Sequence, residues 1–164
     1  MVEKPHKSAA LPLALAYAAL IVYASLYPFA DWRDQGIAPW AYLWAPWPKY
    51  WTGFDFAVNV AGYVPFGFLC ALAVLRTRGG ASAWRVVLRA TAAGAAIAFS
   101  METLQSYLPV RIPSNVDLAL NTAGTVIGAV LAAIAGGLCT HLVVGAHIAR
   151  RLLDHAETRA PKTP

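Results

Sequence analysis

Long runs without charged side chains dominate the hydrophobic pattern of the chain. Residues 8–30 and 56–75 contain no Asp, Glu, Lys or Arg, and residues 118–149 contain none either. About 20 apolar residues cross the core of a bilayer as one helix. The pattern therefore predicts transmembrane helices, and we place four spans at about residues 9–30, 54–75, 86–108 and 116–144. The third span has the shortest charge-free core, which covers only residues 90–101.

Basic residues are distributed unevenly over the loops that these spans define. Ten Lys and Arg side chains fall on the side of the two termini, and three (Arg33, Lys49 and Arg111) fall on the other side. Cytoplasmic loops of membrane proteins carry the excess of Lys and Arg. Both termini are therefore predicted to be cytoplasmic, with a membrane domain over residues 1–149 and a polar cytoplasmic tail over residues 150–164.

The composition supports a membrane protein and argues against other classes. Hydrophobic residues make up 59% of the 164 residues and charged residues 13%, against about 45–50% and 25% in soluble domains. The net charge of +5 does not indicate nucleic-acid binding, because the basic residues flank the spans and form no single patch. Cys70 and Cys139 lie within apolar segments and are interpreted as small buried hydrophobic residues.

An internal repeat divides the chain into two related halves. Residues 52–62 and 114–124 both follow the pattern [ST]-x-x-D-x-A-x-N-x-A-G, and each opens a span on the outer side of the membrane. The fold is thus predicted to be all-α, with four transmembrane helices arranged as two pseudo-repeated hairpins related by an axis along the membrane normal. Thr52 and Ser114 are good N-cap residues, and an acid three positions later completes a capping box.

Polar side chains within the predicted spans define a candidate site in the outer half of the membrane. An ionisable residue inside a span is a candidate functional residue, and a buried amide needs a partner. Glu102 is expected either to act in the site or to pair with Arg111 and fix the hairpin. The candidate binding residues are Asp55, Asn59, Glu102, Gln105, Arg111, Asp117 and Asn121. Gly124 and Gly128 form a small-xxx-small step that lets another helix backbone approach.

The outer loop is rich in tryptophan. Five of the six Trp residues lie between Asp31 and Gly53, at positions 32, 40, 44, 47 and 51. The favoured interpretation is an aromatic belt in the headgroup layer, and the alternative is a stacking surface for a sugar or a lipid headgroup.

Several of these motifs together resemble the VanZ-like family. They are Asn59-x-x-Gly62-Tyr-x-Pro65-Phe66-Gly67, Glu102-Thr-x-Gln105 and Arg111-x-x-Ser114-x-x-Asp117-x-x-x-Asn121-x-x-Gly124-x-x-x-Gly128. The resemblance covers about Leu15 to Gly137. It implies a small multi-pass protein of the bacterial plasma membrane. The family's namesake is associated with lowered susceptibility to the glycopeptide antibiotic teicoplanin, and a general role in the cell envelope is implied here.

Four functional hypotheses follow from the polar cluster. The leading one is a protein that binds membrane lipids or lipid-linked envelope precursors, with Arg111 meeting an anionic group and the acids and amides orienting the ligand. The alternatives are an acid–base enzyme acting on a membrane lipid, a transporter of ions or small solutes, and a purely structural cluster. No spacing typical of a metal or cofactor site is present, so none is expected, and the oligomeric state stays open.

Overall fold

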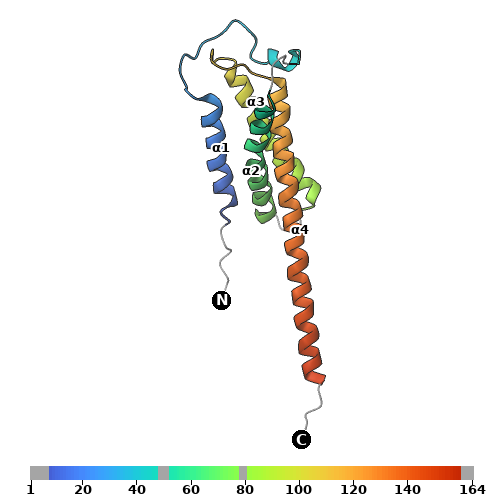
Figure 1. Ribbon diagram of the computed structural model, residues 1–164. Helices are drawn as coiled ribbons and strands as arrows, with labels where there is room; N and C mark the ends of the chain where they lie inside the picture. The colour runs from blue at the N-terminus through green and yellow to red at the C-terminus, as the bar shows by residue number, and fades with distance from the viewer. Residues whose placement is uncertain (1–7, 48–51, 78–80, 160–164) are drawn as a thin grey trace. The chain divides into compact units, whose positions relative to one another are not determined.

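The computed structural model describes residues 8–47, 52–77 and 81–159, with side chains up to Arg151. Over these residues the chain is helical and contains no strand (Figure 1). The elements are α1 (Ala10–Leu26), a 3-10 helix η1 (Ala41–Trp44), α2 (Gly53–Thr77), α3 (Ala83–Gln105) and α4 (Asn115–Arg159). Some residues on which the sequence predictions depend lie outside this description: Lys4, Lys7, Lys49, Trp51, Arg78 and Lys162.

The chain divides into two compact units. The first extends to Ala133 and contains α1, α2, α3 and the beginning of α4, and the second begins at Ile134 and contains the rest of α4. All of the candidate site residues belong to the first unit. The fold of that unit is therefore what positions them.

Three of the described helices are long and apolar enough to cross a membrane. They are α2, α3 and the part of α4 that ends at Arg151. The first helix is apolar too, but with 17 residues it is at the lower limit for a span. The prediction of an all-helical membrane protein is confirmed to this extent, and the predicted first span, at α1, stays a prediction.

The helix bounds differ from the predicted spans in ways that local chemistry explains. The first helix ends at Leu26 instead of residue 30, because Pro28 forces Tyr27 into an extended conformation (ψ 136°). The third lies three residues earlier than predicted, since Arg85 in its first turn does not prevent a helix. The fourth continues to Arg159, well beyond the predicted residue 144. The predicted polar tail is thus helical over most of its length.

The second and fourth helices approach each other closely through glycine. A Cβ atom on Gly124 would overlap the carbonyl oxygen of Val60, and one on Gly128 would overlap that of Val64, one turn further along. Only a residue without a side chain permits such an approach of two backbones. The predicted small-xxx-small packing step is confirmed, and it places the two halves of the sequence repeat beside each other.

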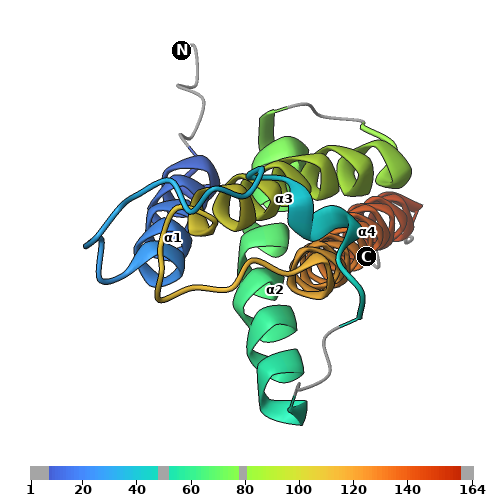
Figure 2. The ribbon, with the colours of Figure 1, turned by 90° about the horizontal axis from the view of Figure 1, so that it is seen from above.

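The first three helices and the α3–α4 segment share a buried apolar cluster. Its members are Ile21, Leu26, Tyr63, Phe66, Ala98, Met101 and Leu108. Between helices that cross a membrane, such side chains stabilise the packing through van der Waals contacts, because lipid chains are as apolar as the side chains themselves. Figure 2 shows α1, α2 and α3 next to one another, with the segment between α3 and α4 crossing from α3 to α4.

The outer loop is attached to the ends of the helices. The backbone amide of Arg33 donates to the carbonyl of Tyr107 (3.0 Å). The side-chain Nδ2 of Asn115 donates to the carbonyl of Ala45 (2.9 Å). Tyr42 is buried, and burial raises the pKa of its hydroxyl group. Trp32, Trp40, Trp44 and Trp47 are all exposed, as the aromatic-belt interpretation requires.

Candidate functional site

The start of α2 is closed by a complete capping box. The Oγ1 atom of Thr52 accepts a hydrogen bond from the Asp55 amide (3.2 Å), and the Asp55 carboxylate accepts one from the Thr52 amide (3.0 Å). The Thr52 hydroxyl also donates to that carboxylate (2.8 Å). The carboxylate of Asp55 is thus occupied by the helix end from which it comes.

The start of α4 has the same sequence pattern but a different set of partners. Ser114 acts as the N-cap, and its Oγ accepts hydrogen bonds from the amides of Val116 (3.2 Å) and Asp117 (3.3 Å). However, the amide of Ser114 donates to Oε2 of Glu102 (2.7 Å), which comes from α3. Glu102 therefore takes the place that Asp55 has in the first repeat. The carboxylate of Asp117 is left out of the capping box.

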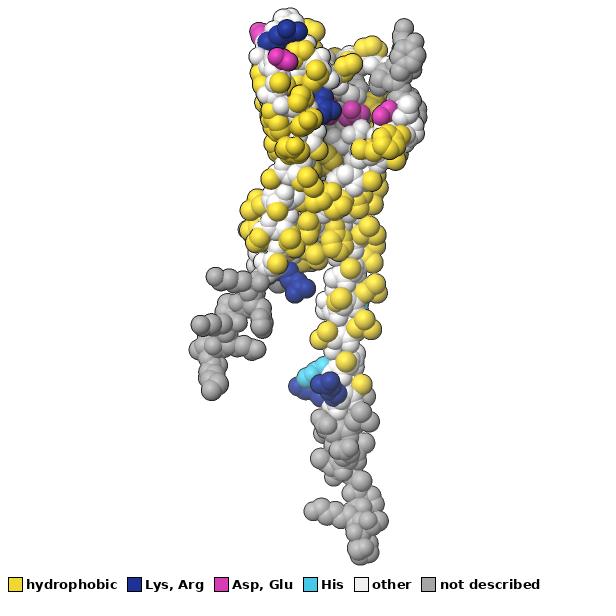
Figure 3. Space-filling view, turned by 60° about the vertical axis from the view of Figure 1, so that its left-hand side comes forward, with side chains coloured by type: hydrophobic (Ala, Val, Ile, Leu, Met, Phe, Trp, Pro, Cys, Tyr) yellow, Lys and Arg dark blue, Asp and Glu magenta, His cyan; other side chains and the backbone are white. Residues whose placement is uncertain are grey.

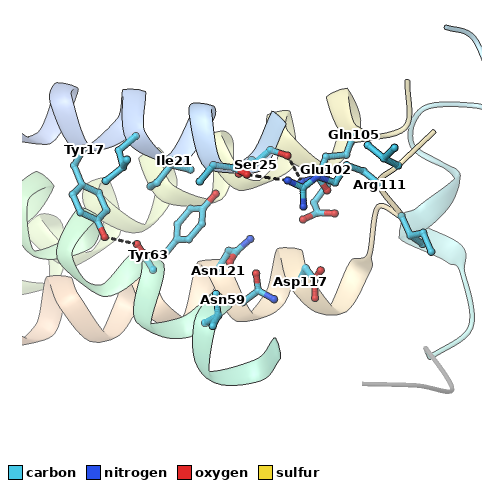
Figure 4. A pocket seen from close by; sticks show the side chains of 16 residues that line it. Tyr17, Ile21, Ser25, Asn59, Tyr63, Glu102, Gln105, Arg111, Asp117 and Asn121 are labelled. Atoms are coloured by element: carbon cyan, nitrogen blue, oxygen red, sulfur yellow. Dashed lines mark hydrogen bonds between the residues drawn. The ribbon is translucent and has the colours of Figure 1, made fainter. Parts of the chain in front are cut away.

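Asp117, whose carboxylate is not part of the capping box, lines a cavity of about 700 Å³ within the first unit. All four α-helices and the α3–α4 segment contribute to its lining (Figure 4). Its polar lining residues are Tyr17, Ser25, Asn59, Tyr63, Glu102, Gln105, Arg111, Asp117 and Asn121. Figure 4 shows Asn59, Asp117 and Asn121 on one side of the cavity and Glu102, Gln105 and Arg111 on the other.

Arg111 is anchored at the carboxyl end of α1. Its Nη2 atom donates hydrogen bonds to the carbonyl oxygens of Ala24 (3.1 Å) and Tyr27 (3.0 Å). These carbonyls lie at a helix end, where the peptide dipoles favour a positive charge. Within the described part of the chain, the alternative ion pair between Glu102 and Arg111 is not formed. The two charged groups stabilise two different helix ends instead.

The amides of the site have different partners. Gln105 donates to the Ser25 carbonyl (3.0 Å), which joins α3 to α1. Asn59 donates from Nδ2 to the Asp55 carbonyl one turn earlier in α2 (3.0 Å). Because that bond uses the nitrogen, the side-chain oxygen of Asn59 stays available to accept a hydrogen bond.

Two polar groups at the cavity are buried without a partner. Asn121 and Tyr63 are each only 5% exposed, and neither Oδ1 of Asn121 nor the hydroxyl of Tyr63 has a hydrogen-bond partner among the described residues. A buried polar atom that lacks a partner destabilises a protein by about 1–3 kcal/mol. Such atoms call for an explanation, and a ligand in the cavity would supply the missing partners.

Exposed apolar side chains surround the opening of the cavity. Leu20, Val58, Val110 and Ile112 line it and are exposed, Ile112 to 88%. In Figure 3, acidic and basic side chains gather at a hollow near one end of this face, with hydrophobic side chains on either side of it and below. The lining therefore combines a polar interior with an apolar entrance.

The structure brings six of the seven predicted site residues to this cavity. They are Asn59, Glu102, Gln105, Arg111, Asp117 and Asn121. Asp55 does not line it, since its carboxylate is held in the capping box at Thr52. Whether the six residues bind a ligand stays a prediction.

Sequence analysis missed the contribution of α1 and of Tyr63. Tyr17 lines the cavity and donates from its hydroxyl to the carbonyl of Gly62 (3.0 Å), and Ser25 lies eight residues further along the same helix. Polar residues at this spacing share one helix face, so the pair is a detectable signal within an otherwise apolar span. Tyr63 is adjacent to a repeat glycine, but nothing in its local sequence shows that its hydroxyl is buried.

The fold and the cavity define a class of protein: a small helical membrane protein whose polar residues converge inside an apolar bundle. The VanZ/LLP1 family model matches residues 7–136, most of the 164 residues. The chain belongs to the VanZ/LLP1 family, which confirms the resemblance that its motifs indicated. No curated protein and no solved structure matches it.

Proposed function

We propose that this protein binds the polar headgroup of a membrane lipid, or of a lipid-linked component of the cell envelope, in the cavity. The observation that supports this most directly is the combination in one site of unpartnered polar groups (Asn121 and Tyr63) with an apolar, exposed rim. A lipid has the same division between a polar headgroup and apolar chains. Ligand sites commonly pair an apolar wall with a few convergent polar groups.

The proposed location follows from the charge pattern and the helix lengths. The protein crosses the plasma membrane of a bacterium four times as two hairpins, with both termini in the cytoplasm and the cavity in the outer half of the membrane. The first helix is about 26 Å long at 1.5 Å per residue, which spans most of a hydrocarbon core. Residues 1–149 form the membrane domain in this proposal, and residues 150–164 lie in the cytoplasm.

We further propose a role in the cell envelope, in line with the family's association with teicoplanin susceptibility. A protein that binds an envelope component at the outer leaflet can change what a glycopeptide antibiotic finds at the cell surface. Expression in a susceptible strain, with measurement of the inhibitory concentration of teicoplanin, tests this role. An unchanged inhibitory concentration at verified expression contradicts the resistance role and leaves lipid binding to be tested separately.

The binding proposal is tested by the lipids that stay with the purified protein. The full chain and its Arg111→Ala and Asp117→Asn variants are extracted from the same membranes, and retained lipids are quantified by mass spectrometry. We expect the wild type to retain a defined lipid and the variants to retain less of it. Asp55→Asn is the matched control, because that carboxylate belongs to the same repeat position but lies outside the cavity. Equal retention by all four well-folded proteins contradicts the proposal.

A second candidate is acid–base catalysis on a lipid held in the same cavity. The supporting observation is that two carboxylates from different helices, Glu102 and Asp117, line one cavity. A general acid or base needs such a group within reach of the reacting atom. Turnover of lipid by purified protein, lost in Glu102→Gln at unchanged lipid retention, supports this candidate. Retention without turnover contradicts it.

A further inference from the structure

The carboxylate of Asp117 and the guanidinium of Arg111 line the cavity from opposite sides. On the side of α2 and α4, the carboxylate of Asp117 is an acceptor, and so is the side-chain oxygen of Asn59, whose nitrogen is engaged with the Asp55 carbonyl (3.0 Å). The amide of Asn121 lies on the same side and offers both donors and an acceptor. On the opposite side, the guanidinium of Arg111 offers donors, next to the side-chain oxygens of Glu102 and Gln105. Its Nη2 group is used by Ala24 and Tyr27, which leaves the Nη1 and Nε hydrogens for a ligand.

The first repeat shows why Asp117 is available. In that repeat the acid is bound to its own N-cap, as the Asp55–Thr52 contacts show. In the second repeat Glu102 accepts the corresponding backbone amide, and within the described residues no hydrogen bond to the Asp117 carboxylate is formed. Glu102 is thus a positioning residue, which stabilises the start of α4 and leaves the neighbouring carboxylate to face the cavity.

The charge balance of the cavity points in the same direction. Its lining contains two acids, Glu102 and Asp117, and one base, Arg111. Glu102 is stabilised by the amino end of α4, where the helix dipole favours a negative charge, and Arg111 is stabilised by the carboxyl end of α1. Asp117 is the charged group that lacks a partner of its own. Among the described residues, no group of three or more His, Cys, Asp and Glu side chains is arranged to hold a metal ion. A cation with N–H donors can bind this carboxylate through charge-assisted hydrogen bonds.

We propose that the cavity recognises a phospholipid whose headgroup carries a primary ammonium group, with the ammonium at Asp117 and Asn59 and the phosphate at Arg111. A primary ammonium has three N–H donors for these acceptors, which a trimethylammonium lacks. The buried amide of Asn121 and the hydroxyl of Tyr63 provide further partners for the headgroup. The exposed apolar rim formed by Leu20, Val58 and Ile112 favours a lipid as the source of this headgroup over a soluble amine.

This inference rests on the proposed function, and lipid selectivity tests it. The full chain in detergent is titrated with phosphatidylethanolamine, phosphatidylcholine and phosphatidylglycerol of identical acyl chains, and the bound fraction is measured by native mass spectrometry. We expect phosphatidylethanolamine to bind at least about tenfold more tightly than the other two. Asp117→Asn should weaken phosphatidylethanolamine about 10- to 100-fold, the usual effect of losing a hydrogen bond to a charged group, and leave phosphatidylglycerol unchanged. Asp55→Asn should change neither.

The outcomes separate this inference from the function on which it rests. Equal binding of the three lipids, or an unchanged preference in Asp117→Asn, overturns the ammonium assignment while lipid binding itself stands. Displacement of phosphatidylethanolamine by glycerophosphoethanolamine at equal concentration overturns the assignment of the ligand as a lipid. Absence of any lipid binding to the wild type overturns both proposals. The comparison of lipids on the wild type needs no variant, so misfolding of Asp117→Asn leaves the test decisive.

Discussion

The contact between Glu102 and the start of α4 gives the most quantitative prediction. Glu102 is 3% exposed, and its Oε2 atom accepts the hydrogen bond from the Ser114 amide at 2.7 Å. Replacement by Ala removes this acceptor from a buried backbone donor at a helix end. Replacement by Gln keeps an oxygen in the same place while removing the charge. The two substitutions therefore separate the hydrogen bond from the charge.

The expected loss follows from the contacts removed. A hydrogen bond to a charged group contributes about 1.5–3 kcal/mol, and loss of the one buried methylene group at Cγ costs about 0.8 kcal/mol. The free energy of unfolding should thus fall by about 2–4 kcal/mol in Glu102→Ala. Glu102→Gln should lose about 1 kcal/mol, the difference between a charged and a neutral acceptor. The larger loss is a substantial part of the total stability of a typical domain.

Unfolding by SDS in mixed micelles, followed by circular dichroism, measures these differences. Ser100→Ala is the control on the same helix, because Ser100 is exposed and its hydroxyl donates to its own helix at Ala96 (2.7 Å). We expect the control to unfold like the wild type. If Glu102→Ala and Glu102→Gln are equally destabilised, or if neither is, the capping role assigned to Glu102 is wrong.

Three further predictions concern packing, the unpartnered amide and the outer loop. Gly128→Ala should lower the free energy of unfolding by about 1–3 kcal/mol, because its Cβ would overlap the Val64 carbonyl. Gly137→Ala is the control and should be neutral or slightly stabilising, because its Cβ would meet nothing within 4 Å. Equal effects of the two substitutions in the same SDS titration refute the close approach of α2 and α4. Asn121→Leu removes a buried amide oxygen that lacks a partner. The free energy of unfolding should therefore be unchanged or higher, while the amount of lipid retained by the purified protein falls. Lipid retention at the wild-type level contradicts the assignment of the cavity as the lipid-binding site. Trp44 is 76% exposed, so Trp44→Ala should leave the free energy of unfolding unchanged. It should also reduce the quenching of tryptophan fluorescence by brominated lipid. Undiminished quenching argues against an aromatic belt in the headgroup layer.

Local signals predicted the beginnings of α2 and α4 to within one residue. The caps at Thr52 and Ser114 place the first helical residue at Gly53 and Asn115, because a cap depends on side chains within three residues of the helix end. The end of α1 could have been predicted from Pro28 in the same way. The end of α4 could not, since Gly145 alone does not stop a helix and the residues after it are mostly good helix formers.

The candidate site was predictable in its members and less so in its contacts. The intramembrane polar residues Asn59, Glu102 and Asn121 were identified because polar groups inside a span need partners, and the structure brings them to one cavity. The repeat, by contrast, made Asp55 and Asp117 equivalent. Only the fold distinguishes them, because Glu102 comes from a different helix and takes the cap position at Ser114. Such a contact between distant segments leaves no trace in the local sequence pattern.

An experimental structure of the full chain in nanodiscs that contain phosphatidylethanolamine tests the central claim most directly. The account predicts density for a headgroup within hydrogen-bond distance of Asp117 and Arg111, with acyl chains leaving between Leu20 and Val58. Lipid density confined to the outer faces of the helices, with Asn59, Glu102 and Asn121 separated from one another, would contradict it.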